Sequence, residues 1–154
     1  MIRRNLLFFA VVIIFIFISG CCMAPIKTEL PLLENNIAIK NEDSSKVKMI
    51  IFNSTNKILF GPDMTGRINI KLNDKAIGGL NIGEYTQLII PKGKHRLELV
   101  HLDMVYFKSY HDLVAEKDPL IVEIWATPVS NSLWTLDNLP ADFINNFSPY
   151  KPVD

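Results

Sequence analysis

After residue 46, apolar and polar residues alternate in a series of short runs. Between residues 67 and 73, Ile68, Ile70 and Leu72 are separated by Asn69 and Lys71. This spacing of two is typical of a β-strand that has one face in a core and the other in water. Runs of this kind predict strands over residues 47–51, 67–73, 76–80, 85–90, 95–102, 104–110 and 120–126.

Turn-forming residues separate these runs. Asn73-Asp74-Lys75 tolerates tight turn geometry. In Pro91-Lys92-Gly93-Lys94, proline fixes φ and glycine supplies a positive φ, so we expect residues 95–102 to return antiparallel to residues 85–90. The polar residues 112–118 are expected to form a connection. About seven short strands, with turns roughly every 8 to 12 residues, predict a mainly β fold, an antiparallel β-sandwich.

The alternation stops near the C-terminus. Pro140 would lie in the first turn of a helix, and Phe143 and Phe147 are spaced to share one helical face. We therefore predict a short helix over residues 139–147 that caps one open end of the sandwich.

The first 20 residues have the features of a signal peptide. Arg3 and Arg4 precede an apolar run of 13 residues that ends at Ile18, well short of the roughly 20 residues that cross a bilayer as a helix. Removal of residues 1–20 leaves 134 residues, enough for one domain with a core. The remaining lysines are dispersed among acidic residues, so we expect no nucleic-acid partner.

The sequence Ile18-Ser19-Gly20-Cys21 resembles the lipobox of bacterial lipoproteins. The resemblance implies cleavage between Gly20 and Cys21, with diacylglycerol and an N-acyl lipid on Cys21 and no other cofactor. Two or three acyl chains anchor a protein permanently, since each buried CH₂ contributes about 0.8 kcal/mol. The residue after Cys21 is Cys22 rather than the aspartate of inner-membrane lipoproteins, which favours the periplasmic face of the outer membrane. The alternatives are an ordinary signal peptide cut nearby, after Ala24, and an uncleaved anchor.

Residues 23–46 contain two prolines, several charges and no sustained period. We predict that residues 21–46 form the lipidated N-terminus and a flexible tether to a domain over residues 47–154. A coil of this length would place the domain on the order of 25 to 30 Å from the membrane. Alternatively, residues 37–39 pair as an edge strand.

The turns and strands between residues 47 and 127 resemble PEGA-like domains and the small bacterial lipoproteins related to them. The resemblance rests on residues 67–80, on Gly83-Glu84-Tyr85-Thr86 and on Pro91-Lys92-Gly93-Lys94-His95, and residues 139–147 resemble the closing stretch of the family. The PEGA tetrapeptide itself is missing. The resemblance implies an immunoglobulin-like sandwich in the cell envelope and supplies no catalytic residue.

Histidines are the first candidates for a metal site or a catalytic base. His101 and Asp103 would project to one side of a strand and could share a metal with His111 or Asp112, but no zinc-type spacing occurs. Ser109, His111 and Asp112 are too close in sequence to converge as a triad, and no G-x-S-x-G motif is present. We expect neither a bound metal nor an enzyme.

Four aromatic residues form a candidate partner surface. Trp125 is predicted to point outward, Trp134 falls in the polar stretch 130–138, and Tyr106 and Tyr110 share one strand face. Large rigid side chains of this kind anchor protein partners. Because large aromatics are mostly buried, we instead favour a C-terminal helix that covers Trp125 and Trp134.

These observations favour a lipid-anchored envelope protein that acts as a non-enzymatic interaction module. Its expected partners are the membrane, through the lipid on Cys21, and an envelope protein. An accessory or pilotin-like component of an envelope complex is the alternative. A small hydrolase or a metal-dependent enzyme is the third.

Overall fold

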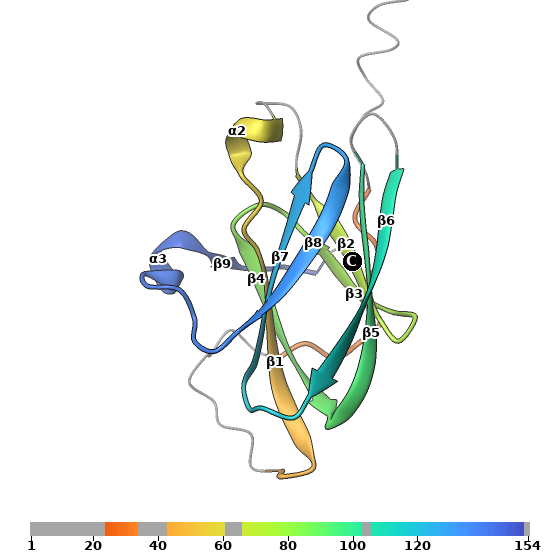
Figure 1. The fold of residues 1–154 in the computed structure, drawn as a ribbon, viewed down its shortest axis with the longest axis vertical. Helices are drawn as coiled ribbons and strands as arrows, with labels where there is room; N and C mark the ends of the chain where they lie inside the picture. The colour runs from red at the N-terminus through yellow and green to blue at the C-terminus, as the bar shows by residue number, and fades with distance from the viewer. Residues whose placement is uncertain (1–23, 34–42, 61–65, 103–105, 153–154) are drawn as a thin grey trace, which may run out of the picture.

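The chain folds into two β-sheets that face each other across a shared core (Figure 1). The computed structural model describes residues 24–33, 43–60, 66–102 and 106–152. The predicted cleavage and lipidation residues, Gly20 and Cys21, lie outside the described residues, as do residues 37–39. The expectation of a mainly β fold is confirmed.

The first sheet has the strand order β8-β7-β1-β4-β9. Its strands are β1 (Lys46–Asn53), β4 (Glu84–Pro91), β7 (Leu120–Thr127), β8 (Ser130–Leu136) and β9 (Ser148–Pro149). β1 pairs in parallel with β7, and β4 pairs in parallel with β9, whereas the other pairs are antiparallel. The sheet is therefore mixed and not wholly antiparallel as expected. Long connections permit this, because only a tight hairpin forces neighbouring strands to be antiparallel.

The second sheet is antiparallel throughout, with the order β3-β2-β5-β6. Its strands are β2 (Ile68–Leu72), β3 (Lys75–Leu80), β5 (Gly93–Leu102) and β6 (Tyr106–Ala115). The predicted turn between β2 and β3 is present, with φ of 48° at Asn73 and 66° at Asp74. The turn at residues 91–94 reverses the chain, but it carries the chain from the first sheet into the second. The expected pairing of residues 85–90 with 95–102 is therefore wrong.

β6 extends well beyond the expected strand, and β8 and β9 add to those expected. β6 continues through residues 112–115, where we expected a connection, because Leu113 and Ala115 point into the core and are 3% and 0% exposed. β8 forms from the polar stretch at residues 130–136, where it pairs with β7. Its polar side chains are compatible with a strand at the edge of a sheet.

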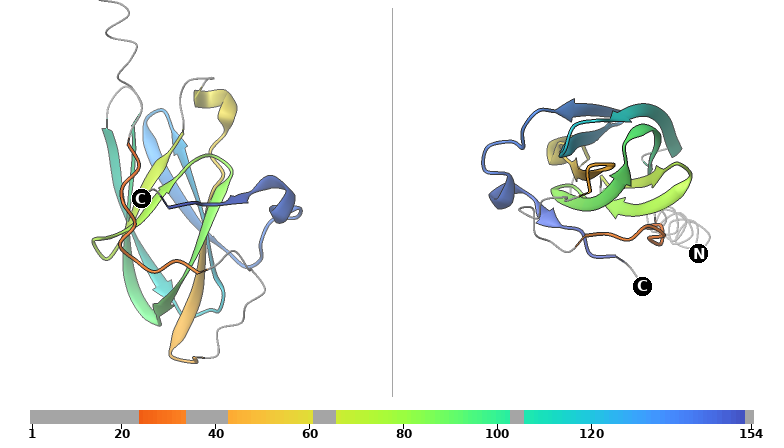
Figure 2. Two further views of the ribbon diagram at one scale, coloured as in Figure 1. Left: turned by 180° about the vertical axis from the view of Figure 1, so that it is seen from behind. Right: turned by 90° about the horizontal axis from the view of Figure 1, so that it is seen from below.

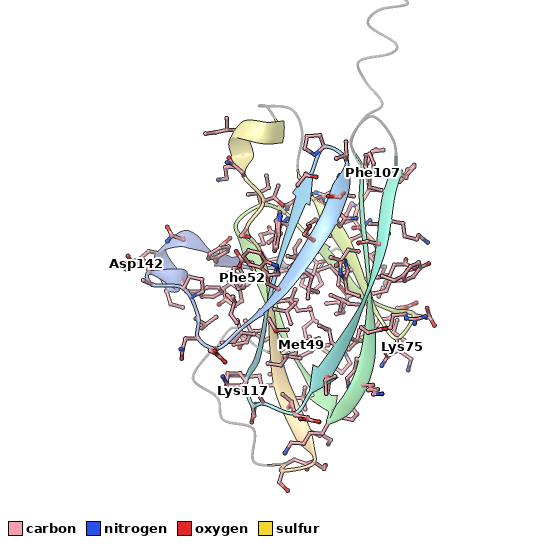
Figure 3. All side chains as sticks on the ribbon, in the orientation of Figure 1. Met49, Phe52, Lys75, Phe107, Lys117 and Asp142 are labelled. Atoms are coloured by element: carbon pink, nitrogen blue, oxygen red, sulfur yellow. The ribbon has the colours of Figure 1, made fainter. Side chains whose placement is uncertain are left out.

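Alternate residues of β1, β2, β4, β5, β6 and β7 fill the space between the sheets (Figure 3). Met49 lies near the middle of this core and is fully buried. The other large, fully buried side chains between the sheets are Ile51, Ile68, Ile70, Ile77, Leu80, Leu88, Leu97 and Leu99.

A short helix, α3 (Phe143–Asn146), confirms the predicted helical segment near the C-terminus. Phe143 and Phe147 pack against Phe52, with ring centroids 5.3 and 4.8 Å away, and Phe143 also lies 5.2 Å from Tyr85. Phe52 and Tyr85 lie on the outer face of the first sheet, so α3 covers that face and not an open end of the sandwich (Figure 1). The other short helix, α2 (Lys57–Phe60), follows β1. No helix among the described residues is long and apolar enough to cross a bilayer.

Residues 24–33, here called the N-terminal strap, lie along the domain beside β3 and β4 (Figure 2). The amides of Glu29 and Leu30 donate to Ala76 O at 2.9 and 3.3 Å, and the amide of Leu33 donates to Gln87 O at 2.8 Å. Leu30 and Leu32 pack against the core. The strap therefore belongs to the folded domain, whereas we expected these residues to form part of a free tether.

Candidate functional site

A groove of about 330 Å³ lies on the outer face of the second sheet. The strap forms one wall, β6 forms the other, and β2 and β5 form the floor. The lining residues are Ala24, Ile26, Asn69, Lys71, Glu98, Val100, Tyr106 and Lys108.

Asn69 fixes the strap to the floor of this groove. Its Nδ2 donates to Ala24 O at 3.0 Å, and its Oδ1 accepts from the amide of Ile26 at 3.4 Å. Gly79 on the neighbouring strand permits this contact, because a Cβ there would collide with Asn69 Oδ1 and would lie 3.4 Å from Pro25 Cα. The strap thus enters the domain at β2, through a close approach that depends on glycine.

A buried carboxylate, Glu98, lies in the groove floor between two lysines. Glu98 pairs with Lys71 Nζ at 3.5 Å and with Lys108 Nζ at 3.4 Å. Burial raises the Glu98 pKa, but hydrogen bonds from Tyr110 and Lys108 and the charge of Lys71 outweigh it and hold the pKa below its usual value. Glu98 is therefore an ionised carboxylate that organises the surrounding cations.

Tyr106 and Tyr110 share the outer face of β6, as predicted. They are 71% and 57% exposed, and Lys108 lies between them with its Nζ 5.9 Å from the centre of the Tyr110 ring. The Tyr110 ring is thus held by a cation–π contact and by Glu98.

Trp125 and Trp134 form a second aromatic feature, on the outer face of the first sheet. Their ring centroids are 4.9 Å apart in an edge-to-face arrangement, and Trp134 is 63% exposed. The expectation that the C-terminal helix covers both residues is wrong. The apolar cluster of Phe143 and Phe147 reaches β7 and β8 only at Ile121 and Leu136, whereas the two tryptophans lie nearer the turn between these strands.

The four predicted aromatic residues do not form one surface. Each sheet turns one face to the core, so the tryptophans and the tyrosines lie on opposite outer faces of the sandwich. Sequence alternation showed which side chains point outward from a strand. It carried no information on which sheet each strand joins.

His95 has a structural role at the turn that joins β4 to β5. Asn73 Nδ2 donates to His95 Nδ1 at 2.9 Å, and His95 Nε2 donates to Pro91 O at 2.8 Å. Asn73 also binds the main chain of Arg96 through its amide and its side chain. The histidine therefore joins two turns of the sandwich.

His101 is buried and links β5 to β8. Its Nδ1 donates to Asn131 Oδ1, and its ring stacks on Phe107 at 5.0 Å. Asn131 Nδ2 donates in turn to Leu99 O and Phe107 O at 3.1 and 3.0 Å. Asn131 on the edge of the first sheet is thus bonded to β5 and β6 of the second sheet. Sequence reasoning missed it because a lone asparagine carries no pattern.

Ser109 and His111 are bonded to each other, with Ser109 Oγ 2.9 Å from His111 Nε2. Burial lowers the His111 pKa. Asp112 lies on the opposite side of the strand and pairs with Arg96 Nε at 3.2 Å, so it does not orient the histidine as a catalytic triad requires. Asp103 lies outside the described residues. Among the described residues, no three side chains of His, Cys, Asp or Glu gather as metal ligands.

Comparisons with protein-family models, with curated proteins and with solved structures find no match to this chain.

Proposed function

We propose that this chain is a lipid-anchored lipoprotein of the bacterial cell envelope that acts without catalysis as an interaction module. The lipobox-like sequence that ends at Cys21 supports the anchor, and Cys22 after it supports the periplasmic face of the outer membrane. The partners are the membrane, through diacylglycerol and N-acyl chains on Cys21, and an envelope protein.

The exposed tryptophan pair carries the proposal of a protein partner. Trp134 remains 63% exposed on a sheet face that Phe143 and Phe147 cover only in part. Trp125 supports its ring from the side, which holds it in one orientation. A rigid, exposed tryptophan presents a large area at little cost in side-chain entropy, as the anchors of protein interfaces do.

The immunoglobulin-like, PEGA-like identity of the domain belongs to the same proposal. Two packed sheets and a β1 strand that pairs in parallel with β7 are compatible with it. An accessory or pilotin-like component is the alternative, and a complex built by strand addition would need a free sheet edge other than β3. At the edge of β3, Ala76 O already accepts from the strap, and Tyr150 packs against Gly78.

Photo-crosslinking in intact envelopes tests the protein partner. A benzoylphenylalanine in place of Trp134 should form one discrete adduct. The same residue in place of Lys75, which is exposed at the start of β3 in the other sheet (Figure 3), should form none. Adducts of equal yield at both positions, or none at position 134, would show that the tryptophan surface has no specific partner.

The anchor has its own test. Mass spectrometry of the purified chain should find acyl chains on Cys21, and Cys21→Ala should remain uncleaved or become soluble. Normal lipid mass and membrane fractionation of Cys21→Ala would overturn the anchor.

A further inference from the structure

We propose that the end of the sandwich formed by α2, the β7–β8 turn and the start of β6 rests directly on the lipid surface. This inference rests on the proposed lipidation of Cys21. It specifies how the anchored domain is oriented. One end of the domain faces the bilayer, and the tryptophan pair on the side of the domain remains accessible to a protein partner.

The first argument is the length of chain between the lipid and the domain. The strap is bonded to the domain from Ala24 onward, where Asn69 Nδ2 donates to Ala24 O at 3.0 Å. Only three peptide units separate Ala24 from Cys21, and consecutive Cα atoms are about 3.8 Å apart, so the two Cα atoms lie within roughly 11 Å. A free coil over residues 23–46 would have allowed a separation of 25 to 30 Å or so. Because the strap is bonded to the domain, this separation is not available, and the domain lies close to the lipid headgroups.

The second argument is where the strap enters. Asn69 pairs with Val100 near the ends of β2 and β5 that adjoin the start of β6. Figure 1 shows that α2, the β7–β8 turn and the start of β6 lie at one end of the molecule, with Phe107 marking it in Figure 3. The turn between β4 and β5 lies at the other end. The short link to Cys21 therefore orients the α2 end toward the membrane.

The third argument is independent of the chain length. The three most exposed large hydrophobic side chains of the described residues are Ile58 at 88%, Val129 at 75% and Tyr106 at 71%. Ile58 lies on α2, Val129 in the β7–β8 turn and Tyr106 at the start of β6, so all three are at the end that the link turns toward the bilayer. Apolar side chains and a tyrosine are the residues that settle at a membrane interface.

Site-specific fluorescence on the full acylated chain in vesicles tests this orientation. The vesicles contain phosphatidylethanolamine and phosphatidylglycerol with brominated acyl chains, and Cys22→Ser removes the competing thiol. An environment-sensitive label is attached at Ile58→Cys, at Val129→Cys, or at Lys92→Cys, an exposed control position in the β4–β5 turn at the far end. Circular dichroism checks that each variant is folded.

Labels at positions 58 and 129 should shift to the blue and lose roughly half of their emission, because interfacial apolar groups lie about 5–10 Å into the boundary layer. The label at position 92 should be unchanged. Equal quenching at all three positions, or water-like emission at positions 58 and 129 with lipid present on Cys21, would overturn the orientation while leaving the anchor intact. Quenching at 58 and 129 is expected without any other protein, so burial that requires an added envelope extract would mean that this end docks a protein. A chain without lipid on Cys21 would overturn the anchor and the inference together.

Discussion

A single buried amide, Asn53, should account for a large part of the stability of this domain. Asn53 ends β1 and is fully buried. Its Nδ2 donates to Gly66 O at 2.9 Å and Leu80 O at 3.0 Å, and its Oδ1 accepts from the amide and hydroxyl of Thr55 at 3.0 and 2.6 Å. Thr55 Oγ1 accepts from the amide of Ala126 at 2.8 Å. The side chain thus joins β1 to β3, to β7 and to the residues that lead into β2.

Asn53→Ala should lower the free energy of unfolding by about 3–5 kcal/mol. The substitution leaves two main-chain carbonyls and one main-chain amide without their partner. A buried unsatisfied group costs roughly 1–3 kcal/mol, and the lower half of that range applies because the space left by the side chain admits water. The loss approaches the lower limit of total stability for a domain, about 5 kcal/mol.

Urea unfolding of the full chain in detergent, followed by far-ultraviolet circular dichroism, measures this loss. Ser54→Ala is the matched control, because Ser54 Oγ is half-buried and lies 3.5 Å from Ile124 O, so its removal should cost less than about 0.5 kcal/mol. A loss below about 1 kcal/mol for Asn53→Ala, with an unchanged denaturant slope, would refute the account of Asn53 as a structural hub.

Three further substitutions test other contacts. Asn131→Ala removes the bonds from β8 to β5 and β6 and should lower the free energy of unfolding by about 2–3 kcal/mol, measured by thermal unfolding. Thr135→Ala, at an exposed position of the same strand, should leave it almost unchanged. Equal effects of the two substitutions would contradict the bridging role of Asn131. The Glu98 pKa is lowered from 4.5, so its contribution to stability is complete above that pH and is lost as the pH falls through the folded-state pKa. Glu98→Gln should therefore cost about 1 kcal/mol at neutral pH and nothing in strong acid, and a cost independent of pH would argue against the ion pairs. Gly79→Ala should displace the strap and speed hydrogen exchange at the Ile26 amide, and unchanged exchange would show that the strap does not need the close approach.

Local chemistry accounts for the parts of the fold that were predicted correctly. Ile68, Ile70 and Leu72 point into the core because the side chains of a strand alternate, whichever strands lie beside it. The turn at Asn73 and Asp74 depends only on residues that tolerate a positive φ. Phe143 and Phe147 share a face because helical spacing places them there.

Long-range pairing accounts for the parts that were not. The turn at residues 91–94 reverses the chain, but Pro91 and Gly93 do not determine whether the next strand joins the same sheet. β8 has few apolar residues facing the core, and its place as a strand depends on β7 and on the bonds that Asn131 makes across to the second sheet. The strap has no regular alternation of apolar and polar residues. It is ordered because Ala76 O and Asn69 bond to it and Gly79 leaves room for it.

The inward faces of the strands, the turn between β2 and β3 and the short helix follow from the sequence alone, because each depends on residues within one turn or one strand of each other. The expectation of a lipid on Cys21 depends on equally local residues. Three features emerged only with the three-dimensional arrangement: the exposed tyrosines and tryptophans occupy opposite faces, the helix leaves Trp134 uncovered, and the strap holds the domain within a few residues of Cys21. These features depend on which segments meet across the core, and that choice is made by the packing of the whole chain.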